Sequence, residues 1–322
     1  MSIEHQLKTE LQQYAKQMRY PRELDERINR LSVRVGKAAK PGKTARIALI
    51  AACIFLFSGI AYASSLLYTM HSGKVSVEVS KDEQVQLPDK VNAEIRASFQ
   101  DIRYHLTPGE SAIVYILELE KRNLPALTRV NRPIEYTELN PWAEMTKDSE
   151  GVPLKMPTRM PQGFTFSYGE LEAPVGLVDA TSYSLYSKLL KDKASKSKQS
   201  IVWERDTRSQ AASAGLKSPG LVYMNPKGDP IEIRYQVLET AEGKIDMSLR
   251  TGSATRGEKV TVNGKDGYFT VNNSSFLSDT GIQSTVSWLE ESSNGRTIIY
   301  QISAFSPNIG KEELLLAANG LK

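Results

Sequence analysis

This chain of 322 residues has very little of the chemistry on which metal sites and covalent catalysis depend. It contains one cysteine, Cys53, and three histidines, His5, His71 and His105. A single cysteine allows neither an internal disulfide nor a thiolate zinc cluster, and the carboxy-terminal part has no cysteine for a Cys-His pair. The Gly-x-Ser-x-Gly elbow of serine hydrolases is also missing. We therefore expect a protein that is not an enzyme and carries no metal and no cofactor.

Charge is absent from residues 47–67, a run of twenty-one mostly apolar residues. A helix of this length is about 31 Å long, which matches the hydrocarbon core of a bilayer, so we predict one transmembrane helix over residues 47–67. Two alternatives stay open. Ala61-Tyr62-Ala63 fits a cleavage site after Ala63, so the run could belong to a signal peptide, or it could be a buried helix. The 46 residues before it exceed an ordinary signal-peptide amino terminus, which favours the uncleaved anchor.

Basic residues are concentrated before this run. Residues 1–46 hold eleven Lys or Arg and five Asp or Glu, net +6, whereas residues 69–322 are net −2. Because Lys and Arg beside a transmembrane helix stay in the cytoplasm, we predict a single-pass cell-membrane protein with a cytoplasmic amino terminus and an extracytoplasmic carboxy-terminal part. A basic arm for nucleic acid is the rival explanation. No aromatic or motif context supports it, so we expect no direct nucleic-acid contact.

Two amphipathic helices are predicted within residues 1–46, each with apolar residues three and four positions apart. The two stripes are Leu7, Leu11, Tyr14 and Met18, then Leu24, Ile28, Leu31 and Val35. Between them Pro21 suits the first turn of a new helix and disfavours helical geometry at the residue before it. We therefore expect a helical hairpin or a hinged pair.

So short a segment has too little core to be stable alone. Its stripes pack on each other, lie on the anionic inner leaflet, or bind a cytosolic protein in the manner of a helix in a groove. The residues predicted to bind such a partner are Leu7, Leu11, Tyr14, Leu24, Ile28 and Leu31.

The larger remainder predicts an α+β fold in which antiparallel strands dominate. Three prolines, Pro153, Pro157 and Pro161, stiffen the chain, and we divide it there into an α+β subdomain over residues 72–157 and a β-sheet-plus-helix domain over residues 158–322. Alternating valines predict a strand over residues 74–79. A helix through Val91 and Ile102, a turn at residues 107–109 and a strand over residues 111–119 follow.

The second domain is predicted to begin with a strand over residues 164–168 and a helix over residues 179–193. One side of that helix is predicted to hold Tyr183, Tyr186, Leu189 and Leu190. Its lysine-rich end is either a solvated helix terminus or a site for anionic wall polymers. Strands are then predicted over residues 201–205, 221–224, 231–238, 247–250, 259–262, 268–271, 283–290 and 297–303, with turns at Asn225-Pro-Lys-Gly228, Asn263-Gly264 and Asn294-Gly295 and a final helix over residues 311–318.

The layout resembles that of a known family. The amino-terminal segment of this chain contains the run Tyr20-Pro21-Arg22-Glu23-Leu24-Asp25-Glu26-Arg27-Ile28. This segment, one apolar span and a large cysteine-free part resemble the membrane-bound anti-sigma-factor-like proteins of Bacillus-type bacteria. Many anti-sigma factors carry a cytoplasmic His and Cys zinc cluster, which is excluded here because His5 stands alone. Further on, the runs Val260-Thr-Val-Asn-Gly-Lys-Asp-Gly-Tyr268, Val286-Ser-Trp-Leu-Glu290 and Ile299-Tyr-Gln-Ile-Ser303, followed by the final helix, resemble the sensor-like outer domains of such proteins. This resemblance covers residues 160–322 and implies the curved sheet and helix of lipoprotein carriers.

The resemblance implies a single-pass regulatory protein of the cell envelope of Gram-positive bacteria. Its outer domain would sense an envelope ligand, and its cytoplasmic helices would bind a sigma factor or another cytosolic protein. The alternative is a membrane-anchored extracytoplasmic protein that binds a lipid, a wall polymer or a protein and has no cytoplasmic signalling role.

Overall fold

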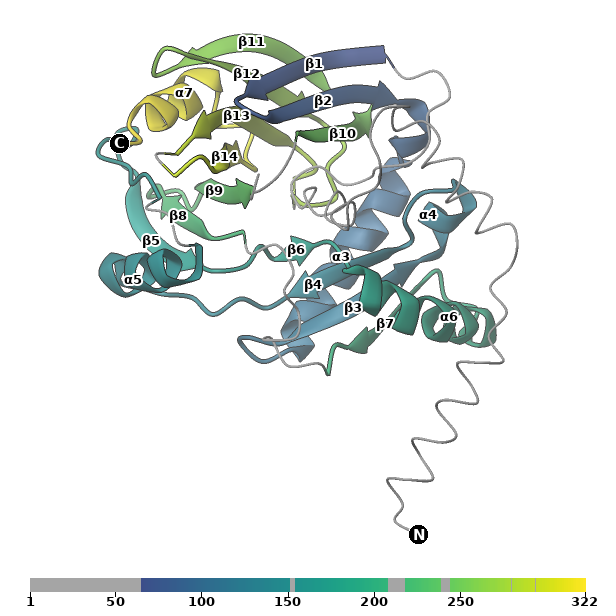
Figure 1. Ribbon diagram of the computed structural model, residues 1–322. Helices are drawn as coiled ribbons and strands as arrows, with labels where there is room; N and C mark the ends of the chain where they lie inside the picture. Colours follow the sequence, from purple (N-terminus) through teal and green to yellow (C-terminus); the bar gives the residue numbers. More distant parts are fainter. Residues whose placement is uncertain (1–64, 151–153, 208–217, 239–243, 279, 293) are drawn as a thin grey trace, which may run out of the picture. The chain divides into compact units, whose positions relative to one another are not determined.

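The computed structural model describes residues 65–322 except 151–153, 208–217, 239–243, 279 and 293 (Figure 1). These described residues all belong to one compact unit. The predicted cytoplasmic helices and residues 47–64 of the apolar run lie outside them. Within the described part, no helix combines the length and the apolar character needed to cross a bilayer.

The described part has the predicted α+β class, and its largest sheet has seven antiparallel strands in the order β11-β12-β13-β14-β9-β8-β5 (Figure 1). The strands are β5 Thr165–Glu170, β8 Gly220–Met224, β9 Pro230–Leu238, β11 Arg256–Val262, β12 Lys265–Asn272, β13 Gln283–Glu291 and β14 Thr297–Ala304. One face packs against helices α5 (Leu139–Glu150) and α7 (Lys311–Asn319). At the centre of this apolar layer Trp288 stacks on Tyr300, with ring centroids 5.0 Å apart.

A three-stranded sheet covers part of the opposite face. It consists of β1 (Ser65–Ser72), β2 (Val75–Asp82) and β10 (Ile245–Gly252), and β10 pairs with β2 in parallel. Val77 and Val79 pack toward Leu289 of the large sheet in one apolar cluster. Tyr68 of β1 also stacks on Tyr268 at 4.2 Å. The two sheets therefore form a sandwich over this half of the large sheet.

Strand β1 corrects the predicted boundary of the transmembrane helix. Residues 65–67, assigned to that helix, form the start of an antiparallel strand in which Ser65 is in register with Lys81. The error has a simple cause, since the uncharged run continues through Leu67, and a short apolar stretch does not by itself show where a helix ends and a strand begins.

The third sheet has four antiparallel strands in the order β6-β4-β3-β7 and lies between two helices (Figure 1). Its strands are β3 Ser111–Ile116, β4 Leu127–Asn131, β6 Val175–Gly176 and β7 Ile201–Arg205. Helix α3 (Asp89–His105) covers one face through Phe99 and its neighbours, and helix α6 (Ala180–Ser197) covers the other through Leu190. Two short helices, η1 (Glu83–Val85) and α4 (Leu117–Lys121), complete the described elements.

Most predicted elements are confirmed, and all eight strands predicted after residue 200 are present within three residues of their expected bounds. At the tight turn between β11 and β12, Asn263 and Gly264 have φ of 48° and 79°, as the Asn-Gly pair predicts. The strand predicted over residues 111–119 ends at Ile116, where α4 begins. Of the four side chains predicted to lie on one side of α6, Tyr186 and Leu190 are buried, whereas Tyr183 and Leu189 are 44% and 51% exposed.

The sheets are shared between the two predicted domains. Strand β7 pairs with β3, and β10 pairs with β2. In each pair one strand belongs to the first predicted domain, before residue 158, and the other belongs to the second. The division of the chain at this position stays a prediction about folding units. Strands β1, β4 and β6 and helix α5 were not predicted.

We predict that Trp288→Ala lowers the free energy of unfolding by about 3–5 kcal/mol, because it removes a fully buried ring from the centre of the large sheet. Urea denaturation of the full-length protein measures the loss. Trp203→Ala on β7, where the ring is only partly buried, serves as the matched control and should cost less. Equal losses in the two variants would contradict the central position of Trp288.

Candidate functional site

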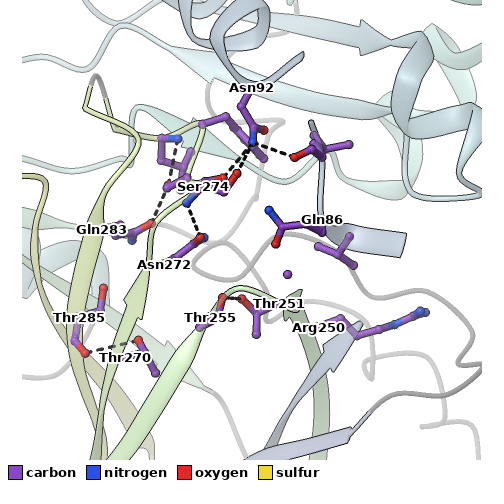
Figure 2. Close-up of a pocket in the computed structure, with 16 residues that line it drawn as sticks. Gln86, Asn92, Arg250, Thr251, Thr255, Thr270, Asn272, Ser274, Gln283 and Thr285 are labelled. Atoms are coloured by element: carbon purple, nitrogen blue, oxygen red, sulfur yellow. Dashed lines mark hydrogen bonds between the residues drawn. The ribbon is translucent and has the colours of Figure 1, made fainter. Parts of the chain in front are cut away.

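A polar pocket of about 80 Å³ lies where three segments distant in sequence meet (Figure 2). The first segment leads from η1 into α3, the second is the end of β10 with the following turn, and the third comprises β12, β13 and the loop between them. Ten of its polar side chains carry no charge: Gln86, Asn92, Thr251, Thr255, Thr270, Asn272, Ser274, Ser275, Gln283 and Thr285. Arg250 is the one charged residue in the lining.

The charge of Arg250 is neutralised within the fold. Its Nη1 donates to Asp82 Oδ2 at 2.5 Å, and the two side chains are only 4% and 2% exposed. Parallel pairing of β10 with β2 places these residues near the ends of adjacent strands. Figure 2 shows the Arg250 side chain extending away from Gln86 and Thr251. The pocket therefore presents an uncharged surface in which polar groups alternate with the apolar side chains Val85, Leu87, Phe276 and Leu277, beside a buried ion pair that joins two strands.

Asn92 connects helix α3 to the loop between β12 and β13. Its Nδ2 donates to Ser274 Oγ at 2.8 Å and to the Ser274 carbonyl oxygen at 3.1 Å. Asn92 is buried on the face of α3 that also carries Ile95 and Phe99. Its Oδ1 is buried and has no hydrogen-bond partner among the described residues. A buried asparagine on an apolar helix face is a signal that the sequence contained and that our prediction did not use.

Gly252 leaves the space that Gln86 occupies. A Cβ at position 252 would lie 2.5 Å from Gln86 Oε1, which is closer than atoms pack. The same Oε1 accepts a hydrogen bond from the Ala254 backbone N–H at 3.2 Å. A side chain at position 252 would therefore displace the Gln86 amide from its present position.

Buried polar groups continue from the pocket across the large sheet. Thr270, Thr285 and Ser303 stand in register on β12, β13 and β14, and Thr285 Oγ1 lies 2.9 Å from Ser303 Oγ. The same face of the sheet carries Ser287 and Gln301, each with a buried polar atom that lacks a partner in the described part of the chain. Such atoms require ordered water or a polar ligand to satisfy their hydrogen bonds.

The size of the pocket limits what it can bind. One water molecule needs about 10–15 Å³ of such space, so this pocket has room for on the order of five water molecules or a group with a similar number of non-hydrogen atoms. Drug-sized ligands occupy about 300–1,000 Å³. Amide and hydroxyl groups in its wall suit a small uncharged polar molecule, or one such group of a larger ligand.

The residues predicted from sequence to bind a cytoplasmic partner, Leu7, Leu11, Tyr14, Leu24, Ile28 and Leu31, lie outside the described residues. His71 is exposed on β1 and His105 is exposed at the end of α3. Over residues 65–322, the described positions include no group of three His, Cys, Asp or Glu residues placed to hold a metal ion.

The lysine-rich end of α6 is partly engaged in ion pairs. Lys191 binds Glu120 at 2.5 Å and Lys193 binds Glu204 at 2.6 Å. Both lysines are about half exposed, so these pairs contribute little to stability. The arrangement is that of a solvated helix end, and a role in binding wall polymers stays a prediction.

No family model, no curated protein and no solved structure matches this chain. The resemblance to anti-sigma-factor-like proteins therefore stays a prediction. The observations that bear on function are the polar pocket, the buried ion pair beside it and the sequence pattern of residues 1–67.

We predict that Arg250→Met lowers the free energy of unfolding by about 3–5 kcal/mol, because it leaves the Asp82 carboxylate buried without its partner. Urea denaturation of the full-length protein measures this loss. The double variant Arg250→Met with Asp82→Leu removes both charges and should recover most of the stability. A double variant that loses the sum of the two single losses would show that the pair is not coupled.

Proposed function

We propose that the chain is a single-pass membrane regulatory protein, anti-sigma-factor-like in its plan. In this proposal residues 65–322 form an extracytoplasmic domain that binds a small uncharged polar ligand or group, and residues 1–46 bind a cytoplasmic protein such as a sigma factor. One observation carries the proposal. Strand β1, which follows the apolar run, belongs to the sheet of β1, β2 and β10, and the residues that follow β2 and end β10 line the pocket.

The apolar run continues in sequence into the first described strand. Strand β1 begins at Ser65, which leaves residues 47–64 for a membrane anchor. Eighteen residues in a helix span about 27 Å, close to the thickness of the hydrocarbon core. An anchor of this length would place the folded part directly at the membrane surface.

Ligand binding at the pocket would act on the sheet that holds β1. Gln86 and Leu87 follow β2, and Arg250, Thr251 and Gly252 end β10, so two of the three strands in this sheet lead into the pocket. A ligand shifts a conformational equilibrium only by as much as it binds one state better than the other. In the proposed mechanism, the two states differ in how firmly these strand ends close on the ligand.

The cytoplasmic half of the proposal is supported by the sequence. The net charge of +6 before the apolar run favours a cytoplasmic location, and the two apolar stripes have too little core to bury each other well. A protein partner for these stripes is what the family resemblance implies.

A second function, an external binding protein with no signalling role, is supported by the surface of α6. Leu185 and Leu189 are exposed one turn apart on this helix, with the exposed Lys188 between them and the exposed Asp192 and Lys196 farther along the helix. Exposed leucines beside lysines are suited to an anionic, partly apolar partner. In this alternative the amino-terminal segment only anchors the chain.

The proposed topology predicts which side of the membrane each part occupies. In a Cys53→Ser background, Ser253→Cys should react with a membrane-impermeant maleimide on intact protoplasts, because residue 253 is exposed in the turn after β10. Ser2→Cys is the matched control and should react only after the membrane is permeabilised. Labelling of Ser2→Cys on intact protoplasts, or a mature chain that begins at Ser64, would contradict the topology.

The proposed partner site predicts a large effect from two substitutions. Full burial of one leucine contributes about 1.5–3 kcal/mol, so Leu11→Asp with Ile28→Asp should weaken partner capture by orders of magnitude. The measurement is crosslinked capture by the full-length chain, followed by identification of the captured protein. Lys8→Ser with Lys16→Ser, on the polar sides of the first predicted helix, is the control and should change capture little. Unchanged capture by the aspartate variant would favour the purely external function.

A further inference from the structure

Three charged side chains are buried together on the large sheet, toward the end formed by β5. They are Glu170 on β5 and Glu232 and Arg234 on β9, and their side chains are 4%, 14% and 7% exposed. The Arg234 guanidinium contacts both carboxylates through Nη2. This cluster belongs to neither the pocket nor the apolar core.

A glycine allows the arginine to reach the edge strand. Gly220 on β8 is in register with Arg234 on one side and with Glu170 on the other. A Cβ at Gly220 would lie 2.8 Å from Arg234 Nη1, so the guanidinium occupies the space that a side chain would fill. Nη1 also donates to the Ser218 carbonyl oxygen at 2.9 Å. Arg234 thus crosses β8 and ties β9 to β5.

The charges of the cluster do not balance. An arginine side chain keeps its positive charge in proteins, so two ionised carboxylates would give the site one excess negative charge. An uncompensated buried charge is costly, and such a group takes up a proton instead. Burial raises the pKa of Glu232 to about 7. The direction agrees with the charge count.

Neighbouring charges do not remove this imbalance. Tyr168 on β5 lies close enough to Glu232 for the carboxylate to raise the pKa of the phenol, although burial is the larger cause. Glu135, before α5, acts on the same phenol in the same direction, and Arg103 of α3 opposes it. Glu135 and Arg103 carry opposite charges, and burial is the cause of the raised pKa of Glu232.

A second cluster also has one arginine and two carboxylates, but its second carboxylate has an additional source of stabilisation. Arg129 binds Asp206 at 2.8 Å and Asp179 at 3.3 Å. There Asp179 caps the amino terminus of α6 and accepts hydrogen bonds from Ser182, including one from the backbone N–H at 2.9 Å. The positive end of the helix dipole stabilises that second carboxylate. Glu232 lies within a strand and has no helix terminus of its own.

We propose that Glu170, Arg234 and Glu232 form a proton-binding site that controls how firmly the edge strand β5 is held on the seven-stranded sheet. With one proton bound, the site is neutral and Arg234 pairs with Glu170. When the proton leaves, the excess negative charge weakens the attachment of β5. The effect extends beyond the strand, because Trp142 of α5 donates to the Glu170 carbonyl oxygen at 2.9 Å and Gly169 pairs with Tyr136.

The direction of the pH dependence follows from the two pKa values of Glu232. The ordinary value of 4.5 applies to the detached or unfolded strand, and the value in the fold is about 7. The stabilising contribution is therefore complete below about pH 4.5 and is lost as pH rises through 7. Between pH 5 and pH 8 these values correspond to a change of about 70-fold in the equilibrium for opening.

Hydrogen exchange of the full-length protein in detergent, corrected for the intrinsic effect of pH, tests the proposal. Amide protection of Thr165–Glu170 should fall by about 70-fold from pH 5 to pH 8 relative to that of Gln283–Glu291. Glu232→Gln should abolish this fall, because glutamine is neutral at every pH. Glu78→Gln, an exposed glutamate on β2, is the matched control and should keep the wild-type response.

Glu170→Gln provides an independent check if Glu232→Gln fails to fold. It leaves one arginine and one glutamate, which are neutral together without a bound proton, so the pH response should again disappear. Wild-type protection of β5 that does not change with pH would overturn the proposal. A folded Glu232→Gln protein that keeps the wild-type response would overturn it as well. Neither outcome depends on the proposed membrane topology or on the cytoplasmic partner.

Discussion

The burial of both faces of the central strands of the seven-stranded sheet is the constraint on which the rest of this structure depends. Every residue of β14 is buried, and so are all the interior residues of β13. The face toward α5 and α7 is apolar throughout its centre, whereas the other face is divided between an apolar region under β1, β2 and β10 and a polar region. Polar side chains in such a position need partners, since a buried donor without one is costly.

The polar region contains two features that serve different chemistry. Toward β12 and β13, hydroxyl and amide groups form the wall of the pocket, where the one charged residue is neutralised by Asp82. Toward β5, two carboxylates share one guanidinium, and the charges do not cancel. The first arrangement suits an uncharged polar ligand, and the second suits a proton. Both lie among strands that the sandwich and the helices hold in place.

The pairing of β10 with β2 is what relates the pocket to the start of the folded part. Residues 245–252 return to pair in parallel with residues 75–82, and this brings the end of β10 beside η1 and the start of α3. Because β1 pairs with the other side of β2, one small sheet contains both the first described strand and two strand ends of the pocket. This continuity is the physical basis for proposing that ligand binding reaches the anchor.

Local chemistry determined what the sequence could predict by itself. Alternating apolar residues located the strands after residue 200, and Asn263-Gly264 located a turn, because period-two burial and positive φ are properties of a few adjacent residues. The tertiary structure alone decided the rest. Strand β1 could not be separated from the apolar run in the sequence, and only its pairing with β2 identifies it. Gly220 is required because the side chain of Arg234, fourteen residues later, crosses its strand. Such roles depend on which strands become neighbours, and that choice is made by packing between distant segments, which no local pattern records.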